Sequence, residues 1–77
     1  MYTVGWISVD GAGSQTMTYA AFKEARIRAN EMQDETDARV WPDGTINPFG
    51  YRYFVSARGR IVYRTNPSVR PGTKAPA

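Results

Sequence analysis

The chain has 77 residues, with ten basic and seven acidic side chains, a net charge of +3 at pH 7, and neither cysteine nor histidine. A chain of this length forms one small domain that buries about 60–65% of the surface its unfolded form exposes. It lacks disulfides, thiolate metal ligands and the usual general bases of catalysis. Its four serines have no histidine to activate them, so we expect neither an enzyme nor a cofactor or metal site.

The sequence shows no signal for membrane insertion or secretion. No apolar run approaches the about 20 residues of a transmembrane helix. Residues 2–9 are apolar but few, and no basic segment precedes them as it would in a signal peptide. The absence of cysteine fits a reducing compartment. We therefore expect a soluble cytoplasmic protein with no membrane partner.

Charge is distributed unevenly along the sequence. Residues 1–45 contain all seven acidic residues and four basic ones, a net charge of −3, whereas residues 46–77 contain six basic residues and no acidic ones. Arginine outnumbers lysine eight to two. Because a guanidinium group can form two parallel hydrogen bonds with a carboxylate or phosphate, this excess favours recognition of those groups. The alternative is a dipolar surface without a partner.

The first predicted elements are strands. Residues 2–9 are rich in β-branched and aromatic side chains and are followed by the turn sequence 10-DGAGS-14. Residues 15–17 can return as a short second strand.

A helix is predicted to begin after Thr18, which can cap it, and to end near Gln33. One apolar stripe at helical spacing consists of Phe22, Ala25, Ala29 and Met32. The acidic residues that follow suit the negative end of a helix dipole poorly. We expect an exposed turn to contain Asp34, Glu35 and Asp37.

Turns and a tail are predicted for much of the remaining chain. The sequence 42-PDG-44 predicts a type I turn within a tight hairpin, and 47-NPFG-50 predicts another turn. Residues 66–77 include three prolines and predict a polyproline-like or disordered tail, or one lying along the body. We therefore expect an α+β domain over residues 1–65, with a single amphipathic helix packed on a small antiparallel β-sheet made of hairpins, followed by a Pro-rich C-terminal tail over residues 66–77.

The segment 51-YRYFVSARGRIVYRT-65 predicts a hairpin whose register decides what its outer face presents. A two-residue loop, Arg58-Gly59, would mix charged and apolar side chains on both faces. A three-residue loop ending at Gly59 would separate them, and we favour it. This register pairs Arg52 with Arg64. It directs toward the helix Tyr51, Tyr53, Val55, Ile61 and Tyr63.

The outer face of this hairpin would then carry arginines around an exposed apolar centre, a composition typical of binding hot spots. The predicted binding residues are Arg52, Phe54, Arg58, Arg60, Val62, Arg64 and Arg70. The facing pair Arg52–Arg64 is repulsive, by roughly 0.2–1 kcal/mol, and a bound anion would relieve that repulsion. Alternatively, Asp37, Asp43 or a carbonyl group neutralises the arginines within the fold.

In length, expected α+β architecture and lack of catalytic side chains, the chain is similar to small inhibitor proteins of bacteriophages and mobile elements, including anti-CRISPR proteins. This resemblance implies a non-catalytic protein that docks on and occludes a bacterial protein or ribonucleoprotein complex in the host cytoplasm, without a cofactor. We expect it to be a monomer or a homodimer.

The alternative is a basic nucleic-acid-binding module that uses the hairpin over residues 51–65. Its arginines and Lys74 would contact phosphates, and Phe54 or a tyrosine would stack on a base. The acidic first half of the chain and its two lysines argue against this interpretation. A third possibility is assembly through an exposed strand edge.

Overall fold

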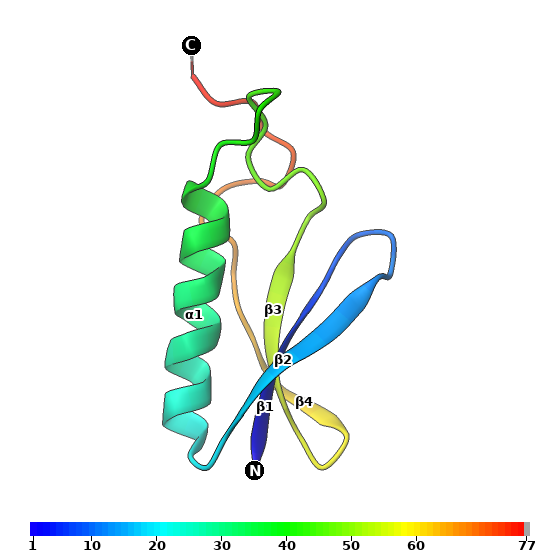
Figure 1. The fold of residues 1–77 in the computed structure, drawn as a ribbon, viewed down its shortest axis with the longest axis vertical. Coiled ribbons are helices and arrows are strands. Elements are labelled where there is room, and N and C mark those ends of the chain that lie inside the picture. The colour runs from blue at the N-terminus through cyan, green and yellow to red at the C-terminus, as the bar shows by residue number, and fades with distance from the viewer. Residues whose placement is uncertain (77) are drawn as a thin grey trace.

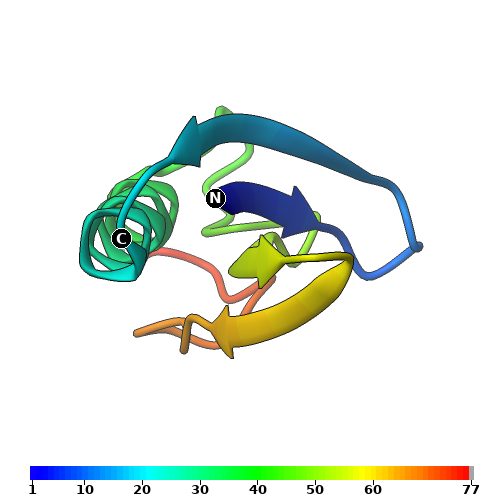
Figure 2. The ribbon, with the colours of Figure 1, turned by 90° about the horizontal axis from the view of Figure 1, so that it is seen from below.

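The computed structural model describes residues 1–76, which contain one helix and four strands. The elements are β1 (Tyr2–Ile7), β2 (Gly13–Tyr19), α1 (Phe22–Ala38), β3 (Arg52–Ala57) and β4 (Arg60–Arg64). The strands form one antiparallel sheet in the order β2-β1-β3-β4. Helix α1 lies along one face of this sheet (Figures 1 and 2). The predicted α+β architecture is confirmed.

A small apolar core joins α1 to the two central strands. Val4 of β1 pairs with Val55 of β3, and both are fully buried, as are Ala25 and Ala29 of α1. The predicted helical stripe faces this core, since Phe22 and Met32 pack against it. The other partly buried side chains around the core are Tyr2, Tyr19, Tyr53 and Tyr63.

The predicted limits of the helix are wrong at both ends. Thr18 lies in β2, and α1 begins at Phe22 after Ala21, which makes no capping side-chain hydrogen bond. The helix continues to Ala38, through the acidic residues expected to form an exposed turn. Asp34 and Glu35 are exposed as expected, but Asp37 is only 4% exposed.

Asp37 is buried because four hydrogen-bond donors surround its carboxylate. Its Oδ1 accepts from Nε2 of Gln33 at 3.1 Å and from Nδ2 of Asn47 at 3.5 Å. Its Oδ2 accepts from the amide of Ser68 at 2.6 Å and from the Ser68 hydroxyl at 3.2 Å. Hydrogen bonds to the charged form compensate its loss of water and its position at the negative end of the helix.

Gln33 and Thr65 extend this buried polar network into the sheet. Nε2 of Gln33 also donates to the Tyr51 carbonyl at 3.1 Å. Oε1 of Gln33 accepts from the Tyr53 amide at 3.2 Å and from the Thr65 hydroxyl at 2.6 Å. Two donated and two accepted bonds fully satisfy this buried amide. The network therefore connects α1, β3 and the chain after β4.

Residues 38–47 form a turn closed by one isolated β-bridge, between Val40 and Ile46, and Thr45 forms a second bridge with Lys74. The Gly44 amide donates to the Trp41 carbonyl at 2.8 Å, and Gly44 has φ of 84°. The turn at 42-PDG-44 is therefore confirmed, but no extended hairpin flanks it.

The C-terminal segment lies against this turn. Ile46 donates to the Thr73 carbonyl at 2.8 Å, and Ala75 donates to the Gly44 carbonyl at 2.7 Å. Through residue 76, the segment follows the body at the end of the molecule where α1 ends (Figure 1).

Asp37→Asn is expected to lower the free energy of unfolding by about 1–3 kcal/mol, because an amide NH2 group would replace one of two accepting oxygens among four donors. Urea unfolding measures this loss. Asp34→Asn, the same change at an exposed position of α1, is the control and should shift stability by no more than about 0.5 kcal/mol. Equal effects of the two substitutions would contradict the structural role of Asp37.

Thr45→Val is expected to raise the pKa of Asp43. The Thr45 hydroxyl, followed by the Thr45 amide and the charge of Lys74, holds the pKa of this carboxyl below its ordinary value. A group whose pKa is lowered on folding contributes stability above its unfolded pKa of about 3.9, and that contribution is lost as pH falls through the folded pKa. NMR titration of the Asp43 carboxyl measures the shift. Thr73→Val is the control, and an unchanged Asp43 pKa in Thr45→Val would refute the assigned cause.

Candidate functional site on the open face of the sheet

The β3–β4 hairpin closes with a two-residue turn, so the predicted three-residue loop is wrong. Arg58 and Gly59 have φ of 52° and 75°, and Ala57 pairs directly with Arg60. Positive φ at both central positions is the requirement of a type I′ turn, which matches the twist of adjacent strands. The pairing then shifts by one residue at Val62, which is left as a bulge.

The two-residue turn and the bulge together decide which side chains face outward. Val55 and Tyr63 both face the helix, as predicted, but they pair with each other rather than with Ile61 and Tyr53. Arg64 pairs with Phe54 rather than with Arg52. Ile61, predicted to face the helix, lies opposite Ser56 on the open face. Arg60 therefore alternates to the other side of the sheet and leaves the predicted ring of arginines.

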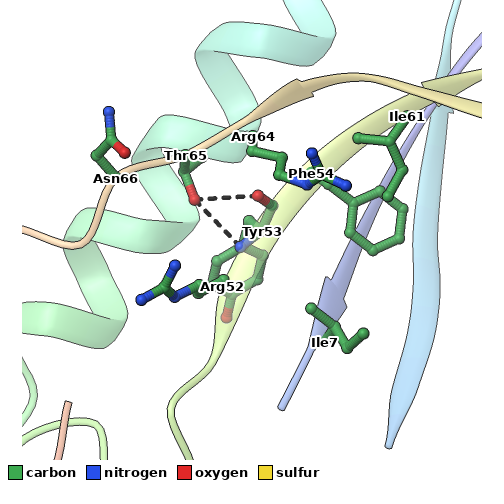
Figure 3. A pocket seen from close by; sticks show the side chains of 8 residues that line it. All are labelled: Ile7, Arg52, Tyr53, Phe54, Ile61, Arg64, Thr65 and Asn66. Atoms are coloured by element: carbon green, nitrogen blue, oxygen red, sulfur yellow. Dashed lines mark hydrogen bonds between the residues drawn. The ribbon is translucent and has the colours of Figure 1, made fainter. Parts of the chain in front are cut away.

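Phe54 forms the centre of the open face. Its ring lies against Gly5 of β1, where an added Cβ would come within 2.6 Å of the ring. A hollow of about 260 Å³ adjoins it (Figure 3). The lining residues are Ile7, Arg52, Tyr53, Phe54, Ile61, Arg64, Thr65 and Asn66. Ile7 and Ile61 are each 46% exposed, so the apolar surface of this hollow is accessible.

Arg52 and Arg64 supply the charge of this hollow. Arg52 pairs with Ile7 in the sheet, and both arginines are exposed. Within residues 1–76 the one ion pair joins Arg28 to Glu35 at 3.6 Å. Neither arginine of the hollow therefore has an acidic partner in the described part of the chain.

The acidic residues that could have neutralised these arginines are engaged elsewhere. Asp37 accepts hydrogen bonds from Ser68, Gln33 and Asn47, and Asp43 accepts from Thr45. The open face thus keeps two positive charges beside an exposed apolar surface.

The structure brings together three of the seven predicted binding residues, Arg52, Phe54 and Arg64. Arg58 is in the exposed turn, and Val62 is the bulge residue, 48% exposed. Arg70 lies in the C-terminal segment, where its carbonyl accepts from the Thr73 amide at 3.2 Å. The other four predicted residues do not line the hollow: Arg58, Arg60, Val62 and Arg70.

The sequence-based prediction missed five residues that line the hollow: Ile7, Tyr53, Ile61, Thr65 and Asn66. Strand alternation after Val4 places Ile7 on the open face and could have identified it. The Thr65 hydroxyl lies 3.1 Å from both the amide and the carbonyl of Tyr53, which fixes the polar end of the hollow (Figure 3).

Within residues 1–76, no group of three or more acidic side chains is arranged to hold a metal ion. The single described helix is too short and too polar to span a membrane. Comparison with known proteins found no matching family model, curated protein or solved structure. The function is therefore inferred from the residues of the site.

Arg58→Asn is expected to stabilise the protein by about 1 kcal/mol, because asparagine tolerates positive φ better than arginine. Thermal or urea unfolding measures the gain. Arg58→Ala removes the same charge but keeps a Cβ that disfavours positive φ, so it should give no comparable gain. A gain as large in Arg58→Ala would show that charge, not backbone conformation, limits stability here.

Proposed function

We propose that the protein is a small non-catalytic binding protein that docks the open face of its sheet on an acidic surface of a partner protein. The observation that carries this proposal is the pair of arginines, Arg52 and Arg64, without acidic partners in the described chain, beside the exposed apolar hollow at Phe54. Arginine and aromatic side chains around a desolvated centre are the usual composition of interface hot spots.

The rigidity of the face supports a docking role. Strand β3, which carries Arg52 and Phe54, is hydrogen-bonded to β1 on one side and to β4 on the other. Side chains on such a strand lose little backbone freedom when a partner binds. The cost of ordering the surface is therefore low.

The distribution of aromatic rings favours a protein partner over nucleic acid. Single-stranded nucleic acids bind where successive bases stack on exposed rings. Here Tyr53 and Tyr63 face the helix, and Phe54 is the one aromatic side chain among the outward-facing strand residues of the described chain. Nucleic-acid binding through the basic hairpin remains the alternative.

We further propose that this docking serves inhibition by occlusion. The partner would be a bacterial protein or ribonucleoprotein complex in the cytoplasm of the host, as expected for a protein that resembles phage inhibitors. Two arginines flanking an apolar hollow would match a carboxylate-rimmed apolar patch on such a complex.

The test compares three tagged proteins in affinity capture from a bacterial lysate, with and without nuclease. The first is the native chain, the second is Arg52→Glu with Arg64→Glu, and the third is Lys23→Glu with Arg26→Glu. The third carries the same charge change near the start of α1, where acidic residues are tolerated. We expect a nuclease-resistant partner with the first and third proteins, and its loss with the second.

Direct titration with single- and double-stranded oligonucleotides distinguishes nucleic-acid binding from docking on a protein. Sub-micromolar binding that weakens steeply between about 50 and 200 mM salt would favour nucleic-acid binding. Partner capture that is equal for all three proteins would refute the open face as the docking surface.

A further inference from the structure

A second hollow, of about 250 Å³, lies on the helix side of the sheet and is lined by three aromatic residues, Trp6, Tyr51 and Tyr53. Trp6 and Tyr53 pair across β1 and β3, and the Tyr53 hydroxyl lies 2.9 Å from the Thr36 hydroxyl of α1. Because strand alternation directs Trp6 and Tyr53 away from Arg52 and Phe54, this aromatic corner is distinct from the basic hollow, although Tyr53 lines both.

The rings meet at nearly a right angle. The Trp6 and Tyr51 rings have an interplanar angle of 80° and centroids 5.0 Å apart. A compact, rounded group placed in such a corner can contact two rings at once, whereas a flat ring can stack on only one of them. The geometry therefore suits a rounded cation, which the negative faces of aromatic rings attract.

The buried polar network holds this corner in place. The Tyr51 amide donates to Oδ1 of Asn47 at 2.7 Å, and the Tyr51 carbonyl accepts from Asn47 and Gln33, each at 3.1 Å. The Tyr53 amide donates to Gln33 at 3.2 Å. Because the rings are already positioned before a ligand binds, little conformational entropy would be lost on binding.

The electrostatic surroundings also favour a cation. Thr36, which contacts Tyr53, lies in the last turns of α1, which contain no basic residue. Of the acidic residues there, Glu35 pairs with Arg28 and Asp37 accepts hydrogen bonds within the buried network, which leaves the exposed Glu31 and Asp34. The C-terminal end of a helix adds partial negative charge. Arg39, the next basic residue, lies over the Trp41 ring with its guanidinium carbon 4.7 Å from the centroid.

We propose that the corner formed by Trp6, Tyr51 and Tyr53 is a binding site for an alkylated ammonium group. The ligand class includes free quaternary ammonium compounds and methylated lysine side chains, which share the same chemistry. Strong hydration disfavours a bare ammonium ion here, whereas methyl groups spread the charge and add apolar contact with the rings.

The test follows the backbone amide signals of Tyr51 and Tyr53 by NMR during titration of the intact protein at constant ionic strength. The probes are tetramethylammonium, choline and 3,3-dimethylbutan-1-ol, which is the uncharged carbon analogue of choline. We expect saturable shifts with both cations in the millimolar range and none of comparable affinity with the alcohol. Equal binding of choline and the alcohol would refute the cation site, as would the absence of shifts up to about 100 mM of either cation.

Trp6→Leu, which keeps an apolar side chain but removes the ring, should weaken choline binding about tenfold or more. Trp41→Phe is the control, since Trp41 contacts Phe49 and does not line the corner. Undiminished binding in a folded Trp6→Leu variant would overturn the proposal. If that variant does not fold, the comparison of choline with its uncharged analogue in the native protein decides.

The source of the ammonium group is distinguished by a further pair of probes. A peptide with one trimethyllysine and the same peptide with unmodified lysine are titrated alongside choline. If the methylated peptide binds more tightly than choline, the site is assigned to modified protein segments. If the methylated peptide and choline bind equally, the site is assigned to small quaternary ammonium compounds.

Discussion

The buried carboxylate of Asp37 is the group on which the arrangement of this small domain depends. The fully buried apolar core consists of two valines and two alanines, which is little surface to hold a helix in one position. Asp37 and its hydrogen-bond partners Gln33, Asn47 and Ser68 supply directional contacts that apolar packing lacks. A shifted helix would leave the buried Asp37 carboxylate without some of its donors, which costs more free energy than the loss of apolar contacts alone.

Strand β3 connects the buried polar network to both proposed sites. Gln33 bonds to the Tyr53 amide and to the Tyr51 carbonyl, so the network fixes the start of the strand. Alternate residues of the strand then point in opposite directions: Tyr53 toward the aromatic corner, and Arg52 and Phe54 toward the open face. One rigid strand thus presents a basic apolar surface on one side and an aromatic pocket on the other.

The sequence predicted what depends on local periodicity and missed what depends on distant partners. Alternation correctly placed Val55 on the helix side, and helical spacing identified the stripe that contacts it. The dipole rule failed for Asp37 because its compensating donors include Ser68, which is 31 residues away. Both loop lengths considered for the β3–β4 hairpin assumed regular strands. The bulge at Val62, which returns Tyr63 to the helix side after the two-residue turn has placed Ile61 outward, has no local signature as clear as that of the turn.

Amide hydrogen exchange, measured residue by residue, shows whether the Asp37 network holds the domain together, because Tyr51 and Ser68 lie outside the strands and their amides donate to the Asn47 and Asp37 side chains. If the polar network holds the domain together, these two amides exchange only through global unfolding, with the same opening free energy as the central strands β1 and β3. Exchange of these amides near the rate of an unprotected peptide would show that the polar network does not hold the domain together.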